Sequence, residues 1–223
     1  MPAPDHLAAP PGGGPAGLRR RGGLRRQPSA EAPHPDRTRR HRTPDQILGP
    51  YFPTGDTPAP QVDLTSVKGA GGLAQGEIIE VTGRVLNLDG EPVCGVPVTI
   101  WQANTFGRYL HVNDPNPAPL DPNFVGCVGI QSDSAGTYRI KTVKPGAYPA
   151  GPDWMRPPHI HFEIHGRFER LITQMYFPDE PLNACDRLLN AALHPDLLIA
   201  APVPLGDRPH HRVLNFDIVL TKG

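Results

Sequence analysis

The sequence predicts an all-β fold, a β-sandwich with long loops and one or two short helices. Thirty prolines and 24 glycines among 223 residues indicate many turns and few long helices. Short runs of apolar and β-branched residues recur along the chain between Gly, Pro and Asp, which is typical of sandwiches. No run of about 18 apolar residues occurs, so the sequence predicts no transmembrane helix and no membrane partner.

Six runs are expected to form strands. The first alternates apolar and polar residues and ends at a turn over 87–90, and the fourth begins directly after two prolines. The expected strands are 77–85, 96–102, 137–143, 159–164, 171–177 and 212–220.

Two helical segments and one long loop complete the expected fold. Thr43 and Pro44 predict a short helical turn over 43–46, with Thr43 as the N-cap. Apolar residues at helical spacing predict a helix over 182–193. The stretch 109–124 is proline-rich and unlike a strand, and a long loop in a compact domain is usually functional.

The first 42 residues differ in composition from the rest. They carry nine arginines against three acids, a charge of +6, which leaves −6 for the remainder because the formal net charge is zero. Rich in Pro, Gly, Ala and Arg and without apolar periodicity, residues 1–42 are predicted to be a disordered basic arm. Such an arm could contact nucleic acid, but a solvated tail is favoured, so no nucleic-acid partner is expected. Residues 43–223 are predicted to form one β-sandwich domain.

The cysteines give no sign of a disulfide framework or a zinc site. Cys94, Cys127 and Cys185 are odd in number and form no C-x-x-C pair. They are interpreted as packed thiols in a reducing compartment, which predicts a cytoplasmic location.

Two histidines stand two residues apart directly after Pro157-Pro158. The period of two in an apolar, β-branched setting is that of a strand, so His159 and His161 are expected on the same face. Two imidazoles on one face can share a metal ion. Alone, the pattern also fits a chance pair on a surface strand.

Two of the five tyrosines lie in predicted loops. Tyr109 ends the run 101–109, and Tyr148 lies in the Pro-Gly-Ala-Tyr-Pro run at 145–149. Each could cap a β-corner with its hydroxyl. A phenol becomes a phenolate near neutral pH only beside a strong cation. Two phenolates with two imidazoles would suit a hard trivalent ion such as Fe(III).

Several ordered motifs together resemble the intradiol ring-cleaving dioxygenases. The resemblance extends over about 43–220 and is far more specific than the histidine pair alone. Its fold would be a prealbumin-like, intradiol-dioxygenase-like sandwich. The matching stretches are 43–52, 83–85, 101–109, 120–124, 145–149, 156–162 and 173–177.

This resemblance implies one non-haem Fe(III) ion held by four side chains. The implied metal ligands are Tyr109, Tyr148, His159 and His161. It further implies that Tyr148 leaves the iron when substrate binds, which makes Tyr148 catalytic, whereas Tyr109 stays. Arg156 and Gln174 are implied to line the site around the reacting ring and oxygen.

The implied reaction inserts both atoms of O2 into a catechol-type, protocatechuate-like ring. Cleavage between the hydroxylated carbons would give a cis,cis-muconate in aromatic compound catabolism. The protocatechuate-like branch is favoured, because the catechol and hydroxyquinol branches carry an N-terminal helical domain for which 1–42 leaves no room. Ala150 stands where that branch usually has Trp, so the ring substituent is open and hydroxyquinol remains an alternative. A homo-oligomer or pairing with an iron-free alpha-type subunit is expected.

Two other classes of protein stay open. The stretch 77–102 also resembles prealbumin-type sandwich modules that bind partners without metal. A zinc or ferrous His-x-His barrel would need a third His or a carboxylate. No third His stands at a natural spacing, and Glu163 is the only close carboxylate. Trp101 is interpreted as packing behind Tyr109, and Tyr176 and Phe177 are interpreted as core.

Overall fold

The computed structural model describes residues 39–54, 61–204 and 212–222. Residues 1–38, which make up most of the predicted arm, therefore lie outside the described residues. The same is true of 55–60, 205–211 and 223. Residues 39–42 do make contacts: the Arg40 amide donates to Leu88 O at 2.8 Å, and Arg42 Nε donates to Glu169 Oε2 at 2.8 Å. No helix in the described part is long and apolar enough to cross a membrane.

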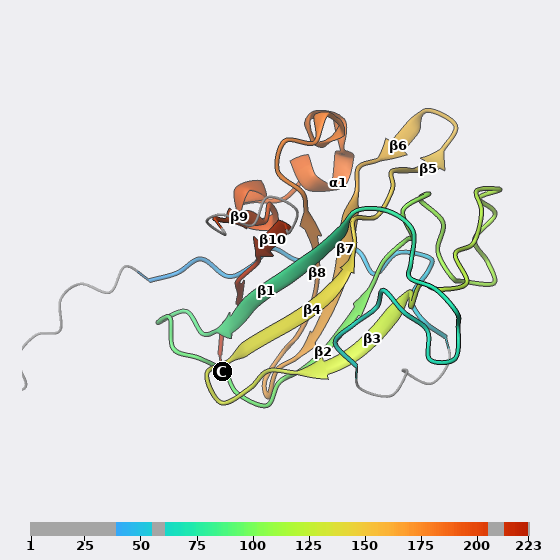
Figure 1. Cartoon of the computed structure of the whole chain (residues 1–223). Helices are drawn as coiled ribbons and strands as arrows, with labels where there is room; N and C mark the ends of the chain where they lie inside the picture. The colour runs from blue at the N-terminus through green and yellow to red at the C-terminus, as the bar shows by residue number, and fades with distance from the viewer. Residues whose placement is uncertain (1–38, 55–60, 205–211, 223) are drawn as a thin grey trace, which may run out of the picture. The chain divides into compact units, whose positions relative to one another are not determined.

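Two sheets form a β-sandwich, as predicted (Figure 1). In the first sheet β1 (Ile78–Leu86) pairs antiparallel with β4 (Thr137–Val143) on one edge. Its other edge pairs in parallel with β10 (Arg212–Asn215) and then β11 (Ile218–Val219), and β10 pairs with β9 (Ala201–Val203).

The second sheet is antiparallel and carries the histidines. Its strands, in spatial order, are β3 (Cys127–Gln131), β2 (Pro97–Trp101), β7 (His159–His165) and β8 (Arg170–Tyr176). A separate hairpin of β5 (Tyr148–Gly151) and β6 (Trp154–Arg156) projects at one end of the sandwich.

The main core lies between the two sheets, and β7 is buried on both faces. Ile160, Phe162 and Ile164 pack into the core with zero exposed area. The alternate residues His159 and His161 are also buried, at 2 % and 3 % exposure. Because successive side chains of a strand point to opposite faces, one face of β7 is free to build a polar site while the other holds the sandwich together.

The helix predicted over 182–193 forms only in part. The segment forms a 3₁₀ turn, η1 (Pro181–Cys185), and one α-helical turn, α1 (Arg187–Asn190), followed by η2 (Pro195–Leu198). The break falls at Asp186, whose extended backbone (φ −75°, ψ 120°) ends η1 and whose carboxylate caps α1 by accepting from the Leu188 and Leu189 amides.

Two further expectations are corrected. The expected strand over 212–220 is split into β10 and β11, because the Phe216 amide donates to Thr82 O and the Asp217 carboxylate accepts the Arg84 amide. The stretch 43–46 is not helical. Thr43 instead exchanges two hydrogen bonds with Val219, one of them through its hydroxyl oxygen.

Other elements were missed or differ in burial. The strands β3, β5, β6 and β9 were not predicted, because each is short and three of them contain Gly or Pro. All three cysteines are free, as expected, but Cys94 and Cys185 are exposed rather than packed.

Candidate metal centre

Four side-chain atoms from three parts of the fold converge on one buried point. Nε2 of His161 lies 3.2 Å from Nε2 of His159 and 3.1 Å from Oη of Tyr109. Nε2 of His159 lies 3.5 Å from Oη of Tyr109 and 3.4 Å from Oη of Tyr148. The structure thus brings together the two histidines and the two tyrosines that the sequence singled out.

Each of the four side chains is positioned by its backbone context. His159 and His161 occupy the first and third positions of β7, directly after the prolines. Tyr148 begins β5 and pairs with Arg156 in the hairpin register. Tyr109 lies in the loop after β2, where its amide donates to Oδ2 of Asp114 at 2.7 Å.

The histidine rings are fixed in orientation. Nδ1 of His159 lies 2.7 Å from Pro157 O, a contact in which the nitrogen must donate, so Nε2 keeps its lone pair for the point of convergence. His161 stacks on Trp101 with ring centroids 4.7 Å apart and an interplanar angle of 14°. Trp101 lies in one hydrophobic cluster with Tyr109, as expected, and also stacks on His161, its partner across β2 and β7.

Burial sets the protonation of the four groups in the absence of a cation. It raises the pKa of Tyr109 well above its ordinary value and also raises the pKa of Tyr148. Burial, together with the positive charge of Arg156, lowers the pKa of His159 well below its ordinary value and that of His161 to about 3. Neutral imidazoles are ready to bind a metal, whereas the phenols would have to lose protons to it.

The donor set fits a metal ion. A metal bound tetrahedrally at about 2.0–2.1 Å separates its ligand atoms by about 3.3–3.4 Å, and the four separations of 3.1–3.5 Å bracket that value. No group of three or more His, Cys, Asp and Glu side chains in the described ranges could hold a metal. A metal at this point would therefore need the tyrosines as ligands.

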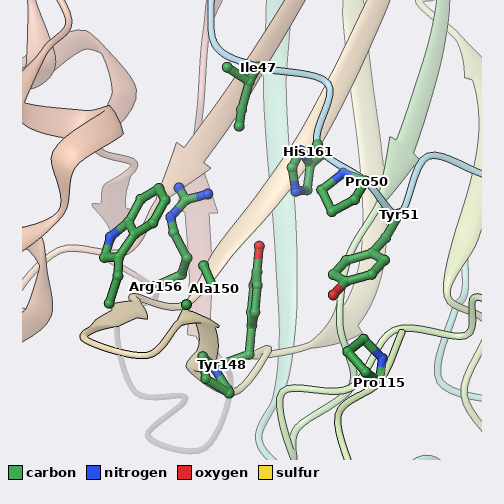
Figure 2. Close-up of a pocket in the computed structure, with 12 residues that line it drawn as sticks. Ile47, Pro50, Tyr51, Pro115, Tyr148, Ala150, Arg156 and His161 are labelled. Atoms are coloured by element: carbon green, nitrogen blue, oxygen red, sulfur yellow. The ribbon is translucent and has the colours of Figure 1, made fainter. Parts of the chain in front are cut away.

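A cavity of about 410 Å³ opens beside the point of convergence (Figure 2). Tyr148 and His161 line it, whereas Tyr109 and His159 do not. The hydroxyl of Tyr148 points toward the end of the cavity where His161 lies. The other lining residues are Ile47, Gly49, Pro50, Tyr51, Pro115, Pro149, Ala150, Gly151, Trp154 and Arg156.

Arg156 is held by three buried acceptors at the cavity wall. Its Nε donates to Oδ2 of Asp186 at 2.8 Å, and its Nη2 donates to Oε1 of Gln174 at 2.8 Å and to Oη of Tyr176 at 2.7 Å. Its side chain is 3 % exposed and that of Asp186 is fully buried. The planar guanidinium serves three partners at once, which a lysine ammonium cannot reproduce in one plane.

The strand register links this network to the histidines. Across β7 and β8, His159 faces Tyr176 and His161 faces Gln174. Gln174 further donates from Nε2 to Ile47 O at 3.0 Å, which ties the network to the N-terminal segment that lines the cavity.

Sequence reasoning missed three parts of this site. Tyr176 was interpreted as core, but its hydroxyl contacts Arg156 and Gln174; a strand period of two, which places Tyr176 on the face of Gln174, could have found it. No local sequence pattern identifies Asp186 as the ion-pair partner of Arg156. The segment 47–51 matched the family motif but had no role assigned; the Tyr51 ring contacts the Tyr109 ring in a tilted arrangement, with 4.7 Å between ring centroids.

Comparison with known proteins places the chain in a family. Residues 47–222 match the family model described as Dioxygenase. The protocatechuate 3,4-dioxygenase beta chain of Burkholderia cepacia is 45% identical over 165 residues, 71% of this chain and 70% of that protein. The hydroxyquinol 1,2-dioxygenase of a Rhizobium species is 31% identical, over 63% of this chain and 51% of that protein, so this chain spans about half of that relative.

Solved structures share the fold. The dioxygenase domain of a dioxygenase carbohydrate-binding protein fusion from a Streptomyces species is 29% identical, with a TM-score of 0.62, and the match covers 82% of this chain and all of that domain. The 3-chlorocatechol 1,2-dioxygenase of Rhodococcus opacus superposes with a TM-score of 0.65 at 23% identity, over 82% of this chain and 74% of that one. The chain belongs to the family of intradiol ring-cleavage dioxygenases.

Proposed function

We propose that this protein is a non-haem Fe(III) intradiol dioxygenase. It would insert both atoms of O2 into a catechol-type ring between the hydroxylated carbons, giving a cis,cis-muconate in aromatic compound catabolism. The observation that carries the proposal is the convergence of two phenol oxygens and two imidazole nitrogens beside a cavity of about 410 Å³.

Tyr109, Tyr148, His159 and His161 are the proposed metal ligands. Bound Fe(III) would act as a Lewis acid that draws electron density from a chelated catecholate. Two anionic phenolates and two neutral imidazoles suit a hard trivalent ion. Membership of the dioxygenase family supports the same metal.

Tyr148 is the proposed acceptor of a substrate proton. Of the two tyrosines among the proposed ligands, Tyr148 lines the cavity and Tyr109 does not. Burial favours the protonated form of the Tyr148 hydroxyl. A Tyr148 phenolate displaced by substrate would therefore hold a proton taken from a catechol hydroxyl at its Oη.

Arg156 and Gln174 are the proposed electrostatic groups. Arg156 presents a fixed positive charge at the cavity wall, where it would stabilise negative charge that develops on the ring and oxygen atoms. Gln174 holds the guanidinium in place through Oε1. The three acceptors around Arg156 fix its plane before substrate arrives.

Protocatechuate is the reference substrate, because the beta chain of that enzyme is 45% identical to this chain. Hydroxyquinol is the alternative, from the relative at 31% identity. An alpha chain of the same Burkholderia cepacia enzyme is 32% identical, so either self-association or a second, iron-free chain is a proposed partner.

A visible absorption spectrum before and after a catechol is added tests the proposal. A band from tyrosinate-to-iron charge transfer that shifts with protocatechuate or another catechol is the expected result. A protein that stays colourless after Fe(III) is added would remove the dioxygenase proposal and favour a metal-free sandwich that binds partners.

A further inference from the structure

The cavity is larger than one catechol ring requires. At about 30 Å³ for each water-sized group, the six carbons and two oxygens of catechol fill at most about 240 Å³. Roughly 170 Å³ of the cavity of about 410 Å³ then stays empty, room for about five more non-hydrogen atoms. A substrate that fills this cavity therefore carries a substituent.

The walls of this extra space are apolar. Ile47 and Pro115 line it from two loops, and Pro149, Ala150 and Trp154 line it from the β5–β6 hairpin. Trp154 is itself flanked by the guanidinium carbons of Arg156 and Arg187 at 5.5 and 5.4 Å from its ring centroid. An apolar substituent loses no hydrogen bonds when it enters such a space, whereas a polar one does.

The charges around the cavity do not match an anionic substituent. Arg156 is the one cation among the lining residues of this described cavity, and it is already paired with the buried Asp186 at 2.8 Å. Asp114, which precedes the lining residue Pro115, is also buried and receives the Tyr109 and Asn116 amides at 2.7 and 2.9 Å. Among the lining residues a carboxylate in this space would find no unpaired cation, which makes its desolvation costly.

We propose that the cavity selects catechols with an uncharged apolar substituent of about five non-hydrogen atoms, and that Ala150 determines this specificity. Ala150 lies on β5 between Tyr148 and Arg156 (Figure 2), and its side chain is the smallest that the hairpin points at the cavity. A larger side chain there would occupy the volume reserved for the substituent. The inference rests on the proposed function and narrows its substrate class.

A pair of substrates with substituents of similar size tests the effect of charge. Protocatechuate and 4-isopropylcatechol carry branched three-atom substituents that differ mainly in charge, and 4-tert-butylcatechol adds one carbon. We expect kcat/KM for 4-isopropylcatechol to exceed that for protocatechuate at least about tenfold, the discrimination that one desolvated unpaired polar group supports. Anaerobic spectral titration of each catechol should give dissociation constants in the same order.

Substitution of Ala150 isolates the effect of size. In Ala150→Leu we expect kcat/KM for 4-tert-butylcatechol to fall at least about tenfold, whereas unsubstituted catechol stays within about threefold. Met155→Phe is the matched control, because Met155 is exposed on the same hairpin and does not line the cavity. That control should leave kcat/KM for both substrates unchanged.

The outcomes separate this inference from the proposed function. The specificity is overturned, while the dioxygenase function stands, under either of two results. One is an equal kcat/KM for protocatechuate and 4-isopropylcatechol, and the other is an equal fall in kcat/KM for 4-tert-butylcatechol and catechol in Ala150→Leu. If no catechol is cleaved or perturbs the spectrum of the iron-loaded protein, the proposed function itself is wrong.

Discussion

Arg156 and Asp186 form an ion pair from which water is excluded: Nε donates to Oδ2 at 2.8 Å, and the two side chains are 3 % and 0 % exposed. The other oxygen of the same carboxylate accepts the amides of Leu188 and Leu189 at the start of α1. One side chain therefore fixes the arginine at the cavity wall and begins the helix behind it.

Asp186→Asn should lower stability, because it removes the charge that balances a buried guanidinium. Breaking one side of such a pair costs about 3–5 kcal/mol, and since Asn still caps a helix the loss should be about 3 kcal/mol. Urea unfolding followed by tryptophan fluorescence measures it. Asp196→Asn, an exposed acid in η2, is the control and should change stability by less than about 0.5 kcal/mol. Equal midpoints for the two variants would contradict the pairing.

The histidines and tyrosines could be predicted from the sequence because each carries a local signal. The two-residue spacing places His159 and His161 on one face of β7. Nearby Gly or Pro residues predicted a loop position for both tyrosines, which holds for Tyr109, whereas Tyr148 begins β5. Their convergence could not be read from these signals, since it depends on how the loop after β2 and the β5–β6 hairpin fold back onto β7.

Long-range contacts explain what the sequence did not reveal. Asp186 stands in a segment with helical spacing, and only its contact with Arg156, 30 residues earlier, shows why the helix is broken there. Thr43 fits an N-cap pattern, but its hydroxyl oxygen accepts a hydrogen bond from the amide of Val219, 176 residues away. In both cases a tertiary hydrogen bond overrides a local preference.

Arg156→Lys should lower turnover at least about tenfold, the usual worth of one positioned electrostatic donor. A lysine keeps the positive charge but cannot serve Asp186, Gln174 and Tyr176 together. Steady-state kinetics with the best catechol measure kcat and KM. Arg139→Lys, a surface arginine paired with Glu80, should leave both constants unchanged. Unchanged kcat in Arg156→Lys would remove Arg156 from the mechanism.

Iron binding should strengthen as pH rises. Burial keeps the phenols of Tyr109 and Tyr148 protonated by raising their pKa values, whereas His159 and His161 are neutral because burial lowers theirs. Binding as two phenolates then releases about two protons, so log affinity should rise by about two per pH unit around neutrality. Competition with a chelator between about pH 6 and 8 measures this slope.

The phenol origin of the protons can be checked by substitution. Tyr109→Phe should lower the slope by about one and weaken the visible band, since one phenolate is lost. Tyr138→Phe is the matched control: Tyr138 is a buried tyrosine whose hydroxyl donates to Phe216 O in the core. It should keep both the slope and the band. An unchanged slope in Tyr109→Phe would show that Tyr109 is not an iron ligand.

Gly49 should be required for the position of His161. Its backbone has φ +78°, and a Cβ added there would lie 3.3 Å from Cε1 of His161. Gly69 is the matched control, because it has φ +88° and nothing within 4 Å of an added Cβ. Ala at either position should therefore cost a similar amount of stability, on the order of 1 kcal/mol, from the left-handed backbone alone. Only Gly49→Ala adds pressure on the imidazole, so only this variant should shift the charge-transfer band and weaken iron binding. Equal spectra for the two variants would mean that the segment 47–51 lines the cavity without holding His161 in place.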